Sequence, residues 1–328
     1  MTLVLLIPAI LALFVLVAFL FTLWTARKVE SVLPPRGRFV DVPGARLHVR
    51  EFDGGGDAPP LLLVHGLAAQ LDHYTYGVTD RLAGRYRIIA VDRAGSGHST
   101  RAPGTPADLD TQAAMLAALI GELKLERPLV VGHSLGGALA LALALRHPRH
   151  VGGLALVAPL THMQEHVPPV FEGLTILSPT WRRIVAWTLA IPVAIRNSRA
   201  TLDVVFGPEA VPEDFATRGG GLLGLRPGAF LSASDDLRAL PECLPMQETR
   251  YGELQVPVSI LFGKDDRILD WRAHGQALAD KVPGATLQLI EGGHMLPITN
   301  PDATAAFIDA AAAQATLSAS AVVNAARS

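Results

Sequence analysis

Short, predominantly apolar runs recur along the chain after residue 38, and helical patterns separate several of them. The runs lie at residues 61–64, 87–91, 129–131, 154–157, 257–262 and 286–290. Such runs are typical of strands that are buried on both faces of a parallel sheet. Residues 39–42 and 46–52 predict two further strands, and residues 111–123 and 138–146 predict helices. The alternation predicts an α/β fold with a doubly wound, mostly parallel sheet.

The stretch from residue 160 to residue 250 interrupts this alternation. It contains several prolines, a run of three glycines and one apolar helical pattern at residues 181–196. Because prolines and glycines end regular elements, we expect an inserted helical cap rather than more of the sheet.

The first residues of the chain carry most of its apolar excess. Residues 3–21 contain no charged or hydrogen-bonding side chain, and such a run is long enough as a helix to cross the roughly 30 Å hydrocarbon core of a bilayer. Trp24 follows at the depth expected for a membrane interface, and Arg27 and Lys28 come after it. We therefore expect one transmembrane helix that contacts the membrane through residues 3–23.

Two alternatives to this single-pass anchor remain open. A cleaved signal peptide predicts a basic start, a shorter apolar core and small residues before the cleavage site, whereas this chain begins Met1-Thr2. A buried helix of a soluble protein normally has a polar face, which this run lacks. Basic residues follow the run, so the positive-inside rule places the rest of the chain on the cytoplasmic side of the membrane.

These patterns divide the chain into six parts. We expect an anchor at residues 1–26, a linker at 27–37, the first part of the core at 38–159, the cap at 160–250, the second part of the core at 251–314 and a flexible tail at 315–328.

Composition excludes several classes of protein. The chain has 328 residues, half of them hydrophobic and 18% charged, so it is long and apolar enough for a large buried core. The formal net charge is −2, which gives no indication of a nucleic-acid partner. Cys243 is the single cysteine, so an intramolecular disulfide and a multi-cysteine metal centre are excluded.

The segment Gly132-His133-Ser134-Leu135-Gly136 fits the pattern G-x-S-x-G between a predicted strand and a predicted helix. On such a sharp turn the serine hydroxyl is exposed, and small flanking residues leave room for the bend. The helix that follows stabilises negative charge near its N-terminus. We therefore expect Ser134 to be a nucleophile, with a glycine-rich packing turn as the alternative.

From about residue 38 to residue 310 the chain resembles the α/β-hydrolase superfamily, in particular its serine esterases and lipases. Four features carry the resemblance in order: His65-Gly66 after a strand, the segment from Asp92 to Ser99, the turn at Ser134, and late segments that contain aspartate and histidine. The resemblance implies an α/β-hydrolase sheet with an inserted cap.

The resemblance also implies a catalytic triad in the order serine, acid, histidine. Glu291-Gly292-Gly293-His294 follows the last strand, where the family carries its histidine, so His294 is the expected base. The family pattern G-x-x-D at Gly263 selects Asp266 as the acid. Asp265 is the alternative, and Asp270 is more remote.

Acyl transfer requires two donors for the oxyanion of the tetrahedral intermediate. The backbone N–H of Leu135, directly after the nucleophile, is one expected donor, and by resemblance the backbone N–H of Leu67 is the other. We expect Asp92 and the glycines near it to shape the site without taking part in the chemistry.

These residues together predict hydrolysis of carboxylic esters through an acyl-enzyme, with a small hydrophobic ester as substrate and no cofactor, metal or nucleic acid. Thioester, lactone and carbon–carbon bond hydrolysis use the same parts, and a non-catalytic protein with this fold is a further alternative. The cap is apolar, so Phe171 and Trp181 are predicted to bind the hydrophobic part of the substrate. The alternative is that the apolar stripe of the cap only packs on the core.

Overall fold

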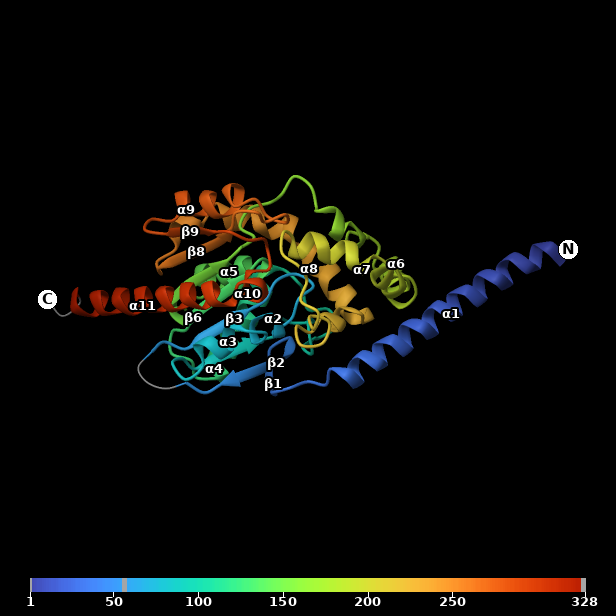
Figure 1. Cartoon of the computed structure of the whole chain (residues 1–328), viewed down its shortest axis with the longest axis horizontal. Coiled ribbons are helices and arrows are strands. Elements are labelled where there is room, and N and C mark those ends of the chain that lie inside the picture. The colour runs from blue at the N-terminus through green and yellow to red at the C-terminus, as the bar shows by residue number, and fades with distance from the viewer. Residues whose placement is uncertain (1, 55–57, 326–328) are drawn as a thin grey trace.

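The computed structural model describes residues 2–54 and 58–325 of the chain. Figure 1 shows a body of layered strands and helices, from which the long helix α1 (Thr2–Val32) extends at one end. The C-terminal helix α11 (Pro301–Ala325) lies at the other end.

One nine-stranded sheet runs through the described body of the protein. Its strands are β1 (Arg38–Val42), β2 (Ala45–Phe52), β3 (Leu61–Val64), β4 (Ile88–Val91), β5 (Thr100–Arg101), β6 (Leu129–His133), β7 (Gly153–Val157), β8 (Val258–Gly263) and β9 (Thr286–Ile290). Their order is β1-β2-β4-β3-β6-β7-β8-β9, with β5 paired to β2. From β4 to β9 every neighbouring pair is parallel, and only the β1, β2 and β5 pairings are antiparallel. The expected doubly wound, mostly parallel sheet is therefore confirmed.

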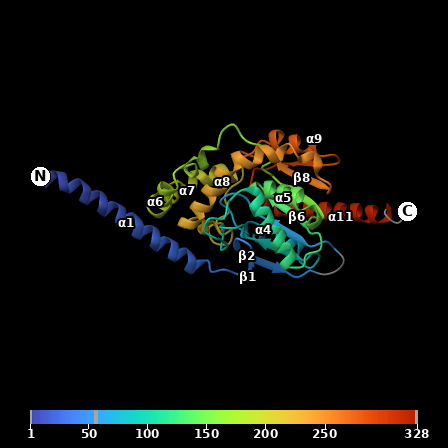
Figure 2. The ribbon, with the colours of Figure 1, turned by 180° about the vertical axis from the view of Figure 1, so that it is seen from behind.

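Helices cover the two faces of the sheet. In the core these are α2 (Asp72–Thr75), α3 (Val78–Leu82), α4 (Leu109–Glu122), α5 (Leu135–Arg146), α9 (Ala277–Lys281), α10 (Leu296–Thr299) and α11, with short turns η1 (Pro148–His150), η4 (Tyr251–Glu253) and η5 (Arg272–Gln276). The α3 and α11 face is seen in Figure 1, and the opposite face with α4 and α5 is seen in Figure 2.

The side chains of the central strands alternate between two apolar cores because successive residues of a strand point to opposite faces. On β3, Leu62 and Val64 pack with α4 and α5, whereas Leu61 and Leu63 pack with α3 and α11. All four are fully buried. Burial on both faces explains why these strands are continuous apolar runs in the sequence.

The expected cap lies between β7 and β8 and is helical. It consists of η2 (Pro169–Leu174), α6 (Pro179–Trp187), α7 (Ala190–Phe206), η3 (Gly221–Gly224) and α8 (Pro227–Glu248). The single helix expected at residues 181–196 is wrong, because the structure breaks it between α6 and α7. Pro192 lies in the first turn of α7, where its missing N–H leaves no intrahelical hydrogen bond unmade. In a helix continuous from α6, the ring of Pro192 would clash with the carbonyl of Thr188, four residues earlier, which disfavours such a helix.

A buried network of charges ties the cap to the core. Arg93, which follows β4, donates to Asp236 of α8 over 2.9 Å, and both side chains are about 1% exposed. Gln112 of α4 contacts the same pair, and Arg101 donates to the other carboxylate oxygen of Asp236 over 3.2 Å. Because these charges are buried, the loss of one partner would leave the others unpaired away from water, so the paired network stabilises α8 against the core.

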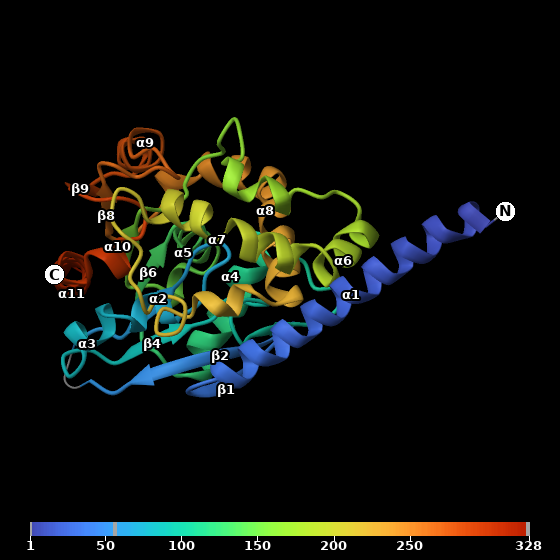
Figure 3. The ribbon, with the colours of Figure 1, turned by 45° about the vertical axis from the view of Figure 1, so that its right-hand side comes forward.

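Helix α1 is longer than the expected anchor. It continues through Val32, so most of the stretch expected as a linker at residues 27–37 is helical, and only residues 33–37 lie between α1 and β1. The helix ends shortly before Pro34-Pro35, as expected from the steric restriction that proline imposes on the preceding residue. Figure 3 shows α1 passing beside the cap helix α6, with which it is in contact.

The C-terminal part of the chain also differs from the expectation. In place of a flexible tail from residue 315, helix α11 continues to Ala325. The alanine-rich composition of this stretch favours a helix. Residues 326–328 of the expected tail lie outside the described residues.

The buried charge network leads to a prediction about stability. Asp236→Asn leaves the Arg93 guanidinium buried without its countercharge, so we expect the free energy of unfolding to fall by about 3–5 kcal/mol. Denaturant titration of the full-length protein in detergent measures this change. The matched control is Asp110→Asn, which removes a half-exposed partner of Arg146 and should cost less than about 1 kcal/mol. Equal losses for the two variants would contradict the role given to Asp236.

Candidate active site

Ser134 lies on a strained turn between β6 and α5. Its backbone has φ 54° and ψ −121°, a conformation that non-glycine residues rarely adopt. Hydrogen bonds fix this turn from both sides, since Ser134 N–H donates to the carbonyl of Val157 over 3.1 Å and Leu160 N–H donates to the carbonyl of Ser134 over 2.9 Å. The surrounding structure thus holds the serine in a conformation that the chain would not adopt alone.

Glycines on both sides of Ser134 are required by close backbone contacts. A Cβ at Gly132 would lie 2.4 Å from the carbonyl oxygen of Gly136, and a Cβ at Gly136 would lie 2.2 Å from that of Val64. Both distances are far inside van der Waals contact, so larger residues would push α5 away from β3 and β6. Steric exclusion of a Cβ atom therefore explains why both flanking positions of the G-x-S-x-G pattern are glycine.

His294 and Asp266 come together at the carboxyl ends of neighbouring strands. Asp266 follows β8, His294 follows β9, and β8 and β9 are parallel. The Nδ1 atom of His294 lies 2.7 Å from Oδ2 of Asp266, and these side chains are 6% and 1% exposed. The other carboxylate oxygen accepts the N–H groups of Ile268 and Leu269 over 2.8 and 2.9 Å. The carboxylate is therefore fixed before it meets the imidazole.

The two other carboxylates considered for the acid are turned elsewhere. Asp265 is exposed to solvent. The side chain of Asp270, which is also exposed, accepts the N–H groups of Arg272 and Ala273. The geometry thus brings Asp266, and neither of these, to His294.

Two residues that the sequence did not single out hold the loop of His294. The Nε2–H of His133 donates to the carbonyl of His294 over 2.9 Å, and burial keeps the pKa of His133 well below its usual value, so its ring stays neutral. Glu209, three residues after the end of α7, accepts the N–H of Gly293 with both carboxylate oxygens at 3.1 and 3.2 Å. The position of His133 next to Ser134 in the sequence could have indicated a role near the site. No motif around Glu209 indicates that it contacts the loop of His294.

The residues of the two expected oxyanion donors line the same cavity. Leu135 opens α5, so its N–H has no acceptor within the helix. Leu67 lies in the loop after β3, directly after His65-Gly66. Both leucines line the cavity that contains Ser134. No hydrogen bond of the Leu67 N–H is formed within the described residues.

His65 stabilises the loop that carries Leu67. Its Nε2 atom accepts the N–H of Arg93 over 2.9 Å, so its Nδ1–H donates to the carbonyl of Gly66 over 2.9 Å. Burial, with a smaller contribution from the Arg93 charge, lowers the pKa of His65 to about 3. A neutral imidazole in one tautomer is therefore a structural part of this loop.

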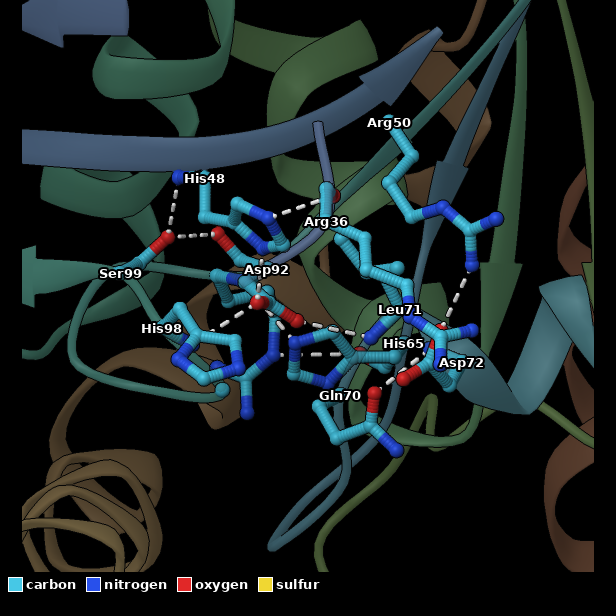
Figure 4. A network of polar contacts seen from close by, with 12 residues as sticks. Arg36, His48, Arg50, His65, Gln70, Leu71, Asp72, Asp92, His98 and Ser99 are labelled. Carbon is cyan, nitrogen blue, oxygen red and sulfur yellow. Dashed lines mark hydrogen bonds and ion pairs between the residues drawn. The ribbon is translucent and has the colours of Figure 1, made fainter. Parts of the chain in front are cut away.

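Asp92 is the centre of a network of polar contacts, which Figure 4 shows. One of its oxygens accepts from Leu71 N–H, and the other meets Nδ1 of His48 and the N–H of His98, each at 2.8 Å. The Nε2–H of His48 donates to the carbonyl of Arg36, two residues before β1, over 2.8 Å. Burial raises the pKa of Asp92, but these hydrogen bonds and the nearby histidines outweigh it and keep the pKa below its usual value. Through His48, the Asp92 carboxylate thus connects Arg36, in the segment after α1, to the loop that contains Leu71.

A cavity of about 280 Å³ opens above Ser134. Ser134, His294 and Phe171 all line it, and no Asp, Glu, Lys or Arg is among its lining residues in the described chain. Ser134 makes no hydrogen bond to His294 across the cavity within the described residues, a looseness that is common in sites without substrate. The apolar walls come mainly from the cap.

One predicted substrate-binding residue is misplaced. Trp181 was expected in the cavity, but it lies on the outer surface of α6 and is 61% exposed. The buried face of α6 contains Arg182 and Ala186, so Trp181 is turned away from the core. Phe171 lies in the cavity wall, as noted above.

No cluster of three or more His, Cys, Asp or Glu side chains that could hold a metal ion occurs within residues 2–54 and 58–325.

Part of the chain matches a known family model. Residues 59–194 match the family model described as the alpha/beta hydrolase fold. The chain is 29% identical to an uncharacterized protein of Mycobacterium tuberculosis over 86% of its length and 82% of that protein. It is also 29% identical to a 2-hydroxy-6-oxononadienedioate/2-hydroxy-6-oxononatrienedioate hydrolase of Burkholderia vietnamiensis, over 75% of this chain and 84% of that one.

A solved structure similar to this one is that of a membrane phospholipase A described as a bacterial virulence factor. It superposes with a TM-score of 0.69 at 24% identity, over 94% of this chain and 97% of that chain. This likeness shows the fold. The chain has the α/β-hydrolase fold, the resemblance inferred from its motifs is confirmed, and the hydrolases among its relatives support a hydrolase.

Proposed function

We propose that the protein is a serine hydrolase that cleaves carboxylic esters with a hydrophobic part through an acyl-enzyme. The observation that carries this proposal is the shared cavity: Ser134 on its strained turn and His294, paired with Asp266, line one apolar chamber. A binding protein with this fold would not require a fixed carboxylate, a paired imidazole and a strained serine at one point.

In the proposed reaction, Ser134 Oγ attacks the ester carbonyl carbon, and Nε2 of His294 accepts the hydroxyl proton. His294 then gives this proton to the leaving alcohol as the carbon–oxygen bond breaks. Water repeats the two steps on the acyl-enzyme and releases the acid. Asp266 accepts the Nδ1–H bond of His294, so it holds the tautomer that leaves Nε2 free and stabilises the imidazolium.

The oxyanion of each tetrahedral intermediate would lie between the N–H groups of Leu67 and Leu135. Preorganised donors in a site with little water are the largest single contribution to many acyl transfers. Both donors belong to the main chain, so they cost no side-chain ordering when the charge develops.

The walls of the cavity favour a neutral, apolar substrate. The Burkholderia relative is named for a dioate, a substrate with two carboxylates, and binding such a molecule calls for cationic partners. The cavity of this chain is lined by neither lysine nor arginine among the described residues. An ester with a hydrophobic acyl or alcohol part therefore fits the lining better than a dicarboxylate in carbon–carbon bond hydrolysis does.

The protein is proposed to act at a membrane. Residues 7–32 of α1 are long and apolar enough to cross a bilayer and lie near the N-terminus. With α1 as a single-pass anchor, the positive charges after the span favour a cytoplasmic body. Membrane lipids would then be the nearest source of hydrophobic esters.

Reactivity of the serine gives the first test of this function. A fluorophosphonate should label Ser134 covalently, and Ser134→Ala should lose both the label and turnover of p-nitrophenyl esters, because Ser134 is the serine on the strained turn that shares the cavity with the paired histidine. Intact-protein and peptide mass spectrometry locate the label. Labelling elsewhere, together with full activity of Ser134→Ala, would reject the assignment.

The choice between neighbouring carboxylates gives a second, matched test. Asp266→Asn should lower kcat by roughly 10⁴-fold, because an amide at this position favours the wrong imidazole tautomer. Asp265→Asn makes the same chemical change one residue away at an exposed position and should leave kcat within about twofold of the parent. Steady-state kinetics on a soluble ester measure both. Comparable losses would remove Asp266 from its role.

Membrane attachment is tested by deleting residues 1–26. The parent should stay in the membrane pellet after alkaline carbonate washing, and the deletion variant should be released, because a transmembrane helix resists such extraction. A reporter fused at the C-terminus determines the side of the membrane. Release of the parent would contradict the anchor, and an exported reporter would contradict the cytoplasmic side alone.

A further inference from the structure

Outside α1, the largest group of exposed apolar side chains lies on the outer side of α6 and α7. We call this group the cap face; its apolar members are Leu177, Trp181, Ile184, Trp187, Leu189, Val193 and Ile195, which are between 37% and 76% exposed. The other large apolar side chains exposed outside α1, within the described residues, are scattered singly at Phe39, Met163, Met246 and Leu317. Exposed apolar side chains gathered on two neighbouring helices are a candidate interaction surface.

The cap face is joined to α1 by direct contacts. The ring centroids of Phe19 and Trp187 are 5.7 Å apart, and the Thr22 hydroxyl donates to the carbonyl of Thr188 over 3.3 Å. Figure 3 shows α6 against the middle of the long helix. The residues of α1 that are buried recur every three or four positions, at Ala18, Thr22, Thr25, Ala26 and Val29, so one side of α1 packs on the protein.

These contacts set the depth of the cap face in a bilayer. Trp24 marks the membrane interface at the end of the apolar span, and at 1.5 Å per residue Thr22 and Phe19 lie roughly 3 and 8 Å deeper. Trp187 touches Phe19, so the end of α6 lies at the same depth. Interfacial helices bury their apolar faces about 5–10 Å into the boundary between headgroups and acyl chains, which agrees with this position.

The charges around the cap face fit the surface of a membrane. Residues 173–202 contain no acidic residue. Arg183, Arg196 and Arg199 are exposed there, and no ion pair is formed by these three within the described chain. Apolar side chains bordered by arginines match acyl chains beneath anionic phosphates.

We propose that the cap face is a second membrane contact, which lies in the lipid interface beside the α1 anchor. The occupant of this surface is a bilayer that contains anionic phospholipid. The opposite side of α7 lines the cavity through Thr201, Leu202 and Val205, so this helix separates the bilayer from Ser134. The inference rests on the proposed anchoring by α1 but not on the proposed chemistry.

Fluorescence of the tryptophans tests this contact without reference to activity. Full-length protein is reconstituted into phosphatidylcholine–phosphatidylglycerol vesicles that contain lipids brominated on the acyl chains, which quench nearby indoles. Trp181→Phe should remove a quenched component of the emission, whereas Trp271→Phe, outside α1 and the cap, should remove an unquenched one. Trp24→Phe reports insertion of the anchor in the same sample.

The outcomes separate the two proposals. Quenching of Trp24 without quenching of Trp181 overturns the cap contact and leaves the anchor in place. Absence of quenching at both overturns the anchor and the contact together. Quenching of both tryptophans supports the anchor and the cap contact. If the quenching of Trp181 weakens when phosphatidylglycerol is omitted, binding of anionic lipid by the arginines of the cap face is supported as well.

A second measurement compares two substrates. Trp181→Glu should lower turnover of a long-chain ester embedded in vesicles by about tenfold, because a charged side chain replaces an apolar one at the lipid interface. Turnover of a short water-soluble ester should not change, which also shows that the variant is folded. Leu317→Glu, at a position that is 73% exposed on α11 at the far end of the molecule, is the matched control and should change neither rate. Equal losses on both substrates with Trp181→Glu would overturn the inference.

Discussion

The turn at Ser134 is the constraint on which the rest of the site depends. A residue with φ 54° and ψ −121° persists only where its neighbours prevent relaxation, and here β6, α5 and the carbonyl of Val157 do so. The close approach of α5 to the strands leaves no space for side chains at Gly132 and Gly136. The same turn that strains the serine leaves the N–H of Leu135 without an intrahelical acceptor and places Ser134 in the wall of the cavity. The backbone strain at Ser134, the exclusion of side chains at Gly132 and Gly136 and the position of the proposed nucleophile therefore all arise from one turn.

Parallel strands explain how distant residues reach this turn. The segments after β3, β6, β8 and β9 all leave the sheet at the same edge, so Leu67, Ser134, Asp266 and His294 converge although more than 200 residues separate the first from the last. Each then receives local support. Asp266 is held by backbone N–H groups, and His294 is held through its carbonyl by His133. Placing the reacting groups on fixed main chain reduces the reorganisation that the reaction requires.

Different sides of the cap contact the core, the loop of His294, the cavity and α1. Asp236 of α8 is locked to the core by buried charges, and Glu209 after α7 is bound to the loop of His294. The inner side of α7 closes the cavity, and its outer side continues into exposed apolar surface next to α1. A displacement of α7 therefore affects the cavity wall and the histidine loop together, because Glu209 lies only three residues beyond the end of that helix.

The sequence by itself determined the sheet, because strands buried on both faces must be apolar throughout, and it determined the place of Ser134, because only glycines fit around such a turn. It also contained a reason for the break before α7, in the ring of Pro192. For the acid, the resemblance already favoured Asp266 over Asp265, and the fold brings Asp266 to His294. The tertiary structure alone decided that Glu209 reaches Gly293 and that Trp181 lies outside the cavity. Periodicity records whether a position is buried, but not which distant partner covers it. Those contacts join segments that are far apart in the chain, and only the packing of the cap, α1 and the sheet brings them together.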